Sequence, residues 1–242
     1  MAEREKTYWW HLGRLRIITT YLGRIKAKSN KTARTKILNI GCGTGGTIDM
    51  LEQFGTVDNV DISSDAIKFM KQNGYKRVKK TSGIKLPYKD ETFDIVGAFD
   101  VLEHIDDQIG ALHEWSRVIQ KNGSVVLTVP AYQWLWTDHD VSLHHKRRYT
   151  TRRLLLAAKE AGLSVEKISY AIVFSLPLIV GFRFLNKALG RKNDSETSYV
   201  NVPRWVNSLF TQFLYIEAFF HRHLRFPAGT TVIAILGKQG RD

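Results

Sequence analysis

Residues 39–46 read Asn-Ile-Gly-Cys-Gly-Thr-Gly-Gly; they begin within a short apolar run, residues 36–40, and are followed by a second segment, residues 47–54. The first predicts a buried strand and the second a helix. Glycines at such a junction permit a sharp turn and let a ligand approach bare backbone at a helix N-terminus. Gly41, Gly43 and Gly46 satisfy the spacing G-x-G-x-x-G, whereas Gly41, Gly43 and Gly45 satisfy G-x-G-x-G. The glycine loop alone therefore leaves the ligand open.

A carboxylate at the end of the next predicted strand narrows the class of ligand. That strand covers residues 57–61 and ends on Asp61, 20 residues after Gly41. An acid in this position of a parallel sheet accepts hydrogen bonds from the hydroxyls of a ribose. The glycine loop and Asp61 together predict a site for an adenosine-containing cofactor.

The centre of the chain alternates between predicted strands and helices. A helix over residues 65–73 is closed by Gly74, and strands over 93–99 and 124–129 flank a helix over about 106–120, with Asn122-Gly123 as the turn out of that helix. A helix near 151–161, a strand over 164–170 and a last strand over 230–236 complete the order. This alternation predicts an α/β fold, in which helices cover both faces of a parallel sheet.

The basic excess of the chain is confined to its two ends. The 242 residues include 36 Lys+Arg and 23 Asp+Glu, which gives a net charge of +13. Residues 1–38 hold ten basic and two acidic residues, residues 170–242 hold nine and four, and the centre holds 17 of each. Basic ends favour an anionic partner, either nucleic acid or a membrane surface, with plain solubility as the alternative.

Composition excludes several classes of protein. Apolar residues make up 43% and charged residues 24%, which is typical of a globular chain and not of a disordered or fibrous one. The single cysteine, Cys42, excludes a disulfide framework and any multi-cysteine zinc or iron–sulfur site. No secretory signal is visible at the start of the sequence, so a reducing cytoplasm is the expected location.

Two segments fall outside the alternation of strands and helices. One is an amphipathic helix predicted over about residues 3–28; the other precedes the last strand and contains an uncharged run, 168–182, and an aromatic-rich run, 205–220. Neither run reaches the roughly 18–20 uninterrupted apolar residues of a membrane-spanning helix. Bases beside both segments favour a membrane interface, and the alternative is a helical cap on the sheet or in a dimer.

These patterns divide the chain into four parts. We expect an N-terminal helical segment over residues 1–35 and a cofactor-binding core over 36–170. A helical insertion over 171–228 follows, as a membrane-interface element or a lid, and residues 229–242 hold the last strand and the C-terminus.

Further motifs follow the glycine loop in order. They are Leu86-Pro87-Tyr88, Phe93-Asp94-Ile95-Val96, Asp100-Val101-Leu102-Glu103-His104-Ile105 and Arg117-Val118-Ile119. Over about residues 36–170 this series resembles the class I S-adenosylmethionine-dependent methyltransferases. The resemblance implies a Rossmann-like, seven-stranded sheet with helices on both faces and an antiparallel last strand, and S-adenosyl-L-methionine as the cofactor. The cofactor contacts that it implies are Asn39, Gly41, Cys42, Gly43, Gly45, Asp61, Ile62, Ser82, Gly83, Phe99 and Asp100.

The sequence departs from the family pattern at two of these positions. Asn39 and Ser82 stand where the family usually has acids, one near the methionine end of the cofactor and one near the adenine. An amide or a hydroxyl still forms hydrogen bonds but loses the charge-assisted part. Cys42 is interpreted as a small buried residue of the loop and not as a nucleophile.

The segment after the fifth predicted strand, residues 130–150, carries the candidate acceptor chemistry. It holds three of the eight histidines, two aspartates and two neighbouring arginines. A methyl acceptor needs a base only where it is protonated at neutral pH, and histidine titrates in that range. We predict catalytic roles for His139, His145 and Asp140, and substrate contacts for His104, Tyr132, Arg147 and Arg148.

Simpler interpretations of this segment stay open. Arg148 can pair with an acid such as Asp140, and the tryptophans can belong to the core. A metal site formed by His139, Asp140 and His144 lacks a supporting ligand pattern, so no metal is expected.

A second similarity concerns the substrate. The segment 136–150, Tyr8-Trp9-Trp10 and Phe226-Pro227-Ala228-Gly229-Thr230 are similar to a methyltransferase subgroup often associated with glycan or lipid-linked intermediates in bacteria and archaea. We therefore expect methyl transfer to an O or N acceptor on a small-molecule or lipid-linked substrate, by a cytoplasmic and peripheral membrane protein at an anionic surface.

The alternatives are a soluble methyltransferase of a small molecule or sugar, an RNA methyltransferase, and a non-catalytic cofactor-binding protein. RNA is disfavoured because no Asn/Asp-Pro-Pro-aromatic motif follows the fourth strand. The oligomeric state stays open.

Overall fold

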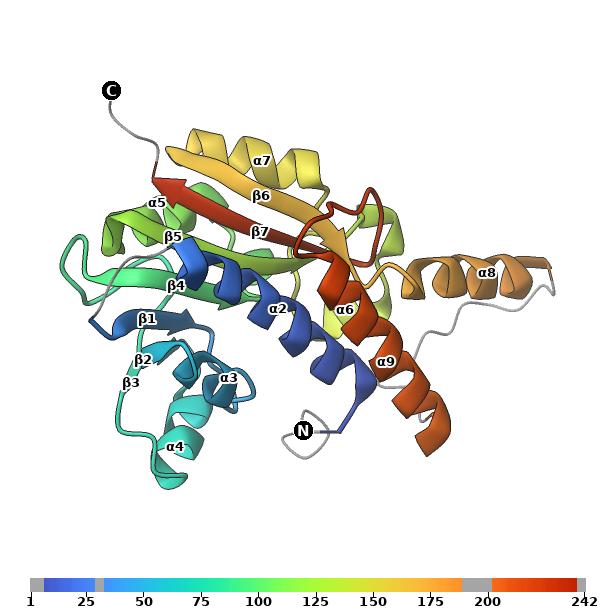
Figure 1. Cartoon of the computed structure of the whole chain (residues 1–242), viewed down its shortest axis with the longest axis horizontal. Helices are drawn as coiled ribbons and strands as arrows, with labels where there is room; N and C mark the ends of the chain where they lie inside the picture. The colour runs from blue at the N-terminus through green and yellow to red at the C-terminus, as the bar shows by residue number, and fades with distance from the viewer. Residues whose placement is uncertain (1–6, 29–32, 189–201, 239–242) are drawn as a thin grey trace.

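The computed structural model describes residues 7–28, 33–188 and 202–238, and its centre is a seven-stranded sheet with the strand order β3-β2-β1-β4-β5-β7-β6 (Figure 1). The strands are β1 (Thr35–Ile40), β2 (Gly55–Asp61), β3 (Val78–Lys80), β4 (Phe93–Phe99), β5 (Ile119–Pro130), β6 (Leu163–Ala171) and β7 (Thr231–Lys238). β1 to β5 pair in parallel, and β7 lies antiparallel between β5 and β6. The predicted Rossmann-like sheet with an antiparallel last strand is confirmed.

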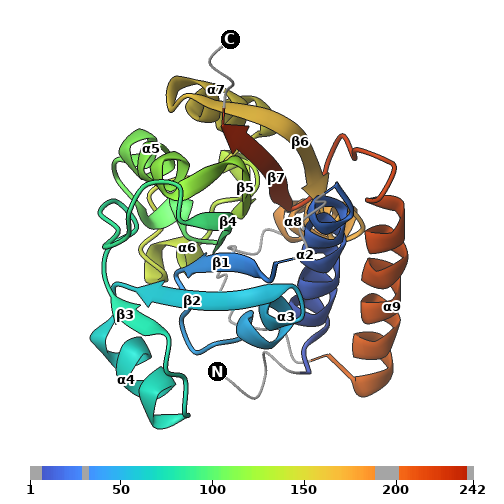
Figure 2. The same ribbon diagram turned by 60° about the vertical axis from the view of Figure 1, so that its left-hand side comes forward.

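Helices cover both faces of this sheet. They are α2 (Trp9–Lys28), α3 (Ile48–Glu52), α4 (Ser64–Gln72), α5 (Gln108–Val118), α6 (Asp138–Ser142), α7 (Thr151–Glu160), α8 (Ser175–Ala188) and α9 (Arg204–Phe220), with 3-10 turns η1 (Leu102–His104) and η2 (Gln133–Leu135). α5 and α7 pack on one face and α2 and α9 on the other (Figure 2). Residues 3–6 of the predicted first helix lie outside the described residues.

The alternation of side chains along the strands produces this two-sided core. In β1, Leu38 and Ile40 belong to the apolar cluster beneath α5 and α7, whereas Ile37 belongs to the cluster beneath α2 and α9. Successive side chains of a strand point to opposite faces, so a strand covered on both sides is apolar at nearly every position. This explains why the central strands are continuous apolar runs in the sequence.

One predicted turn is wrong. Asn122 and Gly123 lie within β5, because α5 ends at Val118 and β5 begins at Ile119. The pairing of β4 with β5 shifts register between Phe93, opposite Ile119, and Ile95, opposite Ser124. Asn122 and Gly123 fall in this irregularity, as the extra residues of a β-bulge do.

The first helix packs against α9, close to the other end of the chain. A Cβ atom at Gly13 would lie 2.0 Å from Cδ1 of Leu214, so glycine alone permits this approach. The Asn207 side chain accepts a hydrogen bond from the backbone N of Trp9 and donates one to the carbonyl of Thr7, both at 2.9 Å. The buried apolar side chains of α2 are Ile17, Ile18, Tyr21 and Leu22. The buried apolar face of α2 therefore covers the sheet, as in the alternative of a helical cap.

α8 and the outer side of α9 are exposed and apolar. α8 projects from the body of the molecule (Figure 1), and its Phe184 side chain is 75% exposed. The other exposed apolar side chains of the two helices are Leu178, Val180, Phe182 and Leu185 on α8, and Trp205, Leu209, Phe213, Tyr215, Ile216, Phe219 and Phe220 on α9. Within the described residues, no helix combines the length and the hydropathy needed to cross a membrane.

Candidate active site

Four neighbouring parallel strands, β2, β1, β4 and β5, end at the same edge of the sheet. The chain runs outward from β1 through β2 to β3, and then crosses to β4 on the other side of β1. Ligands of open α/β sheets bind at the carboxyl edge where the strand order reverses in this way. The glycine loop, Asp61 and Asp100 all follow strands that end there.

The glycine loop presents bare backbone at this edge. Gly41, Gly43 and Gly45 have φ angles of 70°, 50° and 95°, a left-handed region that glycine enters without strain. A Cβ atom at Gly41 would lie 2.4 Å from Cγ2 of Val101, so no larger residue fits. Cys42 is buried beneath the loop, as expected, and burial raises the pKa of its thiol to about 12.

Asp61 ties the glycine loop to the end of β2. Its Oδ2 accepts a hydrogen bond from the backbone N of Gly43, and its Oδ1 accepts one from Ser63, both at 2.8 Å. Each oxygen keeps a second lone pair for a ligand hydroxyl. Beside it, the Ile62 side chain is 70% exposed, and Ile84, on the segment that follows β3, is 42% exposed. This arrangement offers a carboxylate for a ribose and apolar surface for an aromatic base.

The segment after β3 is held next to Asp61. The backbone N of Thr81 donates to the carbonyl of Asp61 at 2.9 Å, and the carbonyl of Gly83 accepts from Nε1 of Trp115 at 2.8 Å. Ser82 lies between these two fixed points and is half-buried. The structure thus brings Ser82 and Gly83 to the same edge as the glycine loop.

Asn39 supports the glycine loop from inside the sheet. Its side chain is buried, and Nδ2 donates to Oδ1 of Asn59 at 3.0 Å and to Oγ1 of Thr47 at 3.2 Å. Its Oδ1 has no hydrogen-bond partner within the described part of the chain. The oxygen is therefore the atom through which Asn39 can reach a ligand.

Arg14 of α2 completes the edge, and the sequence motifs do not indicate it. Its Nη2 lies 3.0 Å from Oδ2 of Asp100, while Oγ1 of Thr128 donates to the other oxygen of Asp100 at 3.0 Å. The guanidinium also lies over the ring of Trp10, 5.1 Å from its centroid. The available signal was the i,i+4 spacing of Trp10 and Arg14, which places both on one side of a helix. Phe99, just before Asp100, is buried.

Asp140 is fully buried and holds two predicted site residues in place. Its Oδ1 accepts hydrogen bonds from Nδ1 of His145 and Nε of Arg148, and its Oδ2 accepts them from Nη2 of Arg148 and the backbone N of Thr137, all at 2.8 Å. Burial alone raises the pKa of Asp140, but the hydrogen bonds from His145 and Arg148 outweigh it and hold that pKa well below its usual range. Asp140 is thus a positioning residue and not a proton acceptor, and the Arg148 guanidinium pairs with it.

His104 and His145 meet beside a buried carboxylate. Their ring centroids are 4.7 Å apart, and His104 is exposed. Although the residue as a whole is exposed, partial desolvation of its imidazole, with the neighbouring His145, lowers the pKa of His104. Glu103 is fully buried, and neither of its oxygens has a hydrogen-bond partner among the described residues. Burial, reinforced by the charge of Asp100, raises the pKa of Glu103 well above its usual value.

The remaining predicted residues lie on the same segment after β5. His139 is half-buried on α6, and burial lowers its pKa. Nη2 of Arg147 donates to the carbonyl of Asp106 at 3.0 Å. Tyr132, with a φ of 55°, stacks on Trp134 and on Tyr170 at centroid distances of 5.5 Å and 4.9 Å.

α8 is fastened to the acceptor segment by one arginine. Nη1 of Arg183 donates to the carbonyl of Trp134 at 2.7 Å, and its Nη2 donates to the carbonyl of Leu135 at 3.0 Å. These carbonyls belong to η2, two and three residues beyond Tyr132. The exposed apolar helix therefore lies directly beside the candidate acceptor site.

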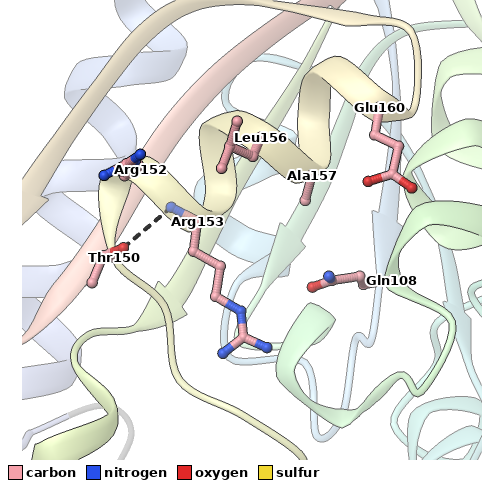
Figure 3. A pocket seen from close by; sticks show the side chains of 7 residues that line it. All are labelled: Gln108, Thr150, Arg152, Arg153, Leu156, Ala157 and Glu160. Atoms are coloured by element: carbon pink, nitrogen blue, oxygen red, sulfur yellow. Dashed lines mark hydrogen bonds between the residues drawn. The ribbon is translucent and has the colours of Figure 1, made fainter.

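A pocket of about 310 Å³ lies apart from these residues, between α5 and α7. Its walls are Gln108, Thr150, Arg152, Arg153, Leu156, Ala157 and Glu160 (Figure 3). Thr150 caps α7 by accepting a hydrogen bond from the backbone N of Arg153 at 3.1 Å. The pocket contains none of the predicted cofactor or acceptor residues.

Known proteins resemble this chain in both sequence and fold. Residues 38–127 match the family described as a methyltransferase domain. Cycloartenol-C-24-methyltransferase 1 of Oryza sativa subsp. japonica is 27% identical over 154 residues, which are 54% of this chain and 44% of the rice protein. The ubiquinone biosynthesis O-methyltransferase of Klebsiella pneumoniae (strain 342) is 28% identical over 134 residues, 48% of this chain and 53% of that protein. The chain thus spans about half the length of these relatives.

A solved structure covers more of the chain. The methyltransferase in complex with the Haloferax volcanii Trm112 methyltransferase activator has a TM-score of 0.60 at 16% identity, covering 100% of this chain and 93% of its own. The sheet order and the carboxyl-edge site are those of the fold that these methyltransferases share. Residues 38–127 are similar to a methyltransferase domain.

Proposed function

We propose that the protein transfers a methyl group from S-adenosyl-L-methionine to an oxygen or nitrogen acceptor at the carboxyl edge of the sheet. The observation that best supports this proposal is that Asp61 holds the glycine loop, whose backbone is bare, with the exposed side chain of Ile62 beside it. Asp61 would bind the ribose, Ile62 the adenine, and the glycine loop with Asn39 the methionine part. When bound, the cofactor supplies an electrophilic methyl carbon on a sulfonium.

The acceptor is proposed to lie beside His104, His145 and Tyr132. Because Nδ1 of His145 is hydrogen-bonded to Asp140, Nε2 is the nitrogen that can take a proton from an acceptor hydroxyl. His139 is a second candidate base on the same segment. Small-molecule acceptors are in keeping with relatives named for cycloartenol and for ubiquinone biosynthesis.

Calorimetry with S-adenosylhomocysteine, followed by transfer of a labelled methyl group to candidate acceptors, tests this function. Asp61→Ala is expected to abolish most of the binding. Asp58→Asn alters an acid of the same strand, β2, and serves as the matched control. Absence of cofactor binding by the wild-type protein would refute the proposed activity.

We further propose that the acceptor is amphiphilic or lipid-linked and is met at an anionic membrane surface. Exposed apolar side chains on α8 lie beside the acceptor segment through the contact of Arg183 with η2. A pocket of about 430 Å³ between α2, β6 and the residues that follow α9 is lined by Arg16, Arg24, Lys167 and Arg222, with no acid among its lining residues. Apolar surface with adjacent bases is typical of elements that lie in a membrane interface.

Flotation with vesicles tests the membrane surface separately. The protein is expected to float with anionic vesicles at low salt, and less with neutral ones. A Phe182→Ser, Phe184→Ser variant should lose flotation, whereas Leu156→Ser, an exposed apolar position on α7, should not. A wild-type protein that stays in the bottom fraction would refute the membrane surface and leave the methyl transfer untouched.

A further inference from the structure

The Glu103 carboxylate occupies an unusual position in this site. It is fully buried, and neither oxygen has a hydrogen-bond partner within the described part of the chain. The cost of burying an unpartnered carboxylate is high, so such groups are normally paired with a cation or bound to a metal. The nearby cationic side chains have other partners, since Arg148 is bonded to Asp140 and Arg14 to Asp100. Within the described residues, Glu103 therefore has neither a hydrogen-bond partner nor a cation paired with it.

Two imidazoles lie next to this carboxylate. One ligand atom each from Glu103, His104 and His145 lies within 4.8 Å of the others. Ligands of one tetrahedral ion at about 2.1 Å are roughly 3.4 Å apart, so small rotations of the side chains would close the set. His104 is exposed, and it can make such a rotation at little cost.

The surroundings of His145 are those of a metal ligand. Its Nδ1 lies 2.8 Å from Oδ1 of Asp140, which is in turn held by Arg148. Histidines that bind metals nearly always donate their other N–H to a carboxylate or carbonyl in this way, because that bond fixes the ring and the tautomer. Nε2 of His145 is thereby presented as the ligand atom, and with an ion bound there the candidate base would be His139 instead of His145.

We propose that Glu103, His104 and His145 bind one divalent cation of borderline softness, such as Zn²⁺, Co²⁺ or Mn²⁺, in preference to Mg²⁺. Two imidazole nitrogens and one carboxylate suit these ions, whereas Mg²⁺ favours oxygen ligands. Three protein ligands leave a coordination position open on the exposed side of His104. The binding of the ion does not depend on the proposed function. A catalytic role of the ion does: it would bind the oxygen of the acceptor at the open position and lower the pKa of the acceptor hydroxyl.

The set differs from the one that the sequence suggested. His139, Asp140 and His144 are close in sequence, but both oxygens of Asp140 are committed to Arg148, His145 and Thr137. Glu103 and His145 are 42 residues apart and are brought together only by the fold. The expectation that no metal is bound therefore gives way to this proposal.

Calorimetry on the untagged full chain, in the absence of cofactor, tests the proposed metal site. The protein is stripped with EDTA and titrated with ZnCl₂, CoCl₂ or MgCl₂. One equivalent of Zn²⁺ or Co²⁺ is expected to bind, Co²⁺ with the visible absorption of a site containing imidazole. Glu103→Gln and His104→Gln should each weaken binding by about 100-fold or more. Asp106→Asn and His144→Asn alter neighbouring residues outside the set and should change the affinity less than about threefold.

The variants also separate metal binding from folding. Glu103→Gln replaces a buried, unpartnered carboxyl by a neutral amide of nearly the same volume, so the metal-free variant should melt no lower than the wild type. Zn²⁺ should raise the melting temperature of the wild type and not of Glu103→Gln. Equal affinity in Glu103→Gln, an equal loss in His144→Asn and His104→Gln, or no binding by the wild type would each overturn the proposal. S-adenosylhomocysteine binding, measured in parallel, reports separately on the proposed function.

Discussion

Asp140→Asn tests whether Asp140 positions the site or takes part in the chemistry. The carboxylate accepts four hydrogen bonds at 2.8 Å, two of them from Arg148, whose side chain is 14% exposed. The amide keeps one acceptor oxygen but turns a donor towards the guanidinium, which then lacks its counter-ion. Removing one partner of a buried ion pair costs about 3–5 kcal/mol. Because Arg148 retains some access to water, we expect a loss near the lower end, about 3 kcal/mol.

Urea unfolding at pH 7, followed by the fluorescence of the six tryptophans, measures this loss. Asp138→Asn changes an exposed acid in the same helix and should leave the free energy of unfolding nearly unchanged. Adding Arg148→Met to Asp140→Asn removes the uncompensated cation and should restore part of the stability. If Asp140→Asn lost activity but less than about 1 kcal/mol of stability, Asp140 would be acting on the acceptor and the positioning role would be refuted.

The same carboxylate predicts a pH dependence. The pKa of Asp140 is lowered in the folded state, so its contribution to stability is present above the ordinary carboxyl pKa of about 3.9 and is lost as the pH falls below it. The free energy of unfolding of the wild type should therefore decline more steeply below pH 4 than that of Asp140→Asn. Parallel slopes for the two proteins would contradict the low pKa.

The remaining predictions concern four other residues. Asp61→Ala loses two hydrogen bonds to a ribose, about 2–3 kcal/mol, so the Kd for S-adenosylhomocysteine should rise by about 30- to 150-fold in calorimetry; a Kd near that of the wild type would place the ribose elsewhere. Arg14→Gln breaks the pair with Asp100 and should lower the melting temperature and weaken cofactor binding together; an unchanged Kd would separate α2 from the cofactor site. Burial raises the pKa of Cys42 to about 12, so iodoacetamide should modify it far more slowly in the folded than in the urea-unfolded protein at pH 8, and equal rates would show an open loop. Burial lowers the pKa of Lys167 to about 8, so stability should rise between pH 8 and 10, and Lys167→Met should flatten that rise.

The strands and the glycine loop could be predicted because each depends on residues that are close together in the sequence. A buried strand requires apolar side chains on both faces, and the turn at Gly41 requires a residue without a Cβ atom. The register shift that places Asn122 within β5 could not be predicted, since it depends on the pairing with β4. β3 has three residues, too few for a periodic pattern.

The candidate site was predictable in its residue types and less so in their roles. The sequence predicts catalytic roles for Asp140 and His145, and only the burial of Asp140 reveals that it has no access to a substrate. Arg14 reaches Asp100 across 86 positions of sequence, and no local pattern marks such a pair. In the sequence, Arg183 is only a basic residue at the end of an apolar run. Its hydrogen bond to η2 is visible only in the fold.

The packing of α2 on α9 has a consequence for the order in which the protein becomes functional during its synthesis. The glycine loop, Asp61 and the ends of β4 and β5 are all translated before α9 and β7, but Arg14 is held over them by a helix that rests on Leu214. A nascent chain that has been translated as far as β6 therefore contains the glycine loop and Asp61, but α2 lacks the helix α9 that holds Arg14 in place. Tight ligand binding should begin only once the ribosome has released α9 and β7, so the cofactor would stabilise finished molecules in preference to partial ones.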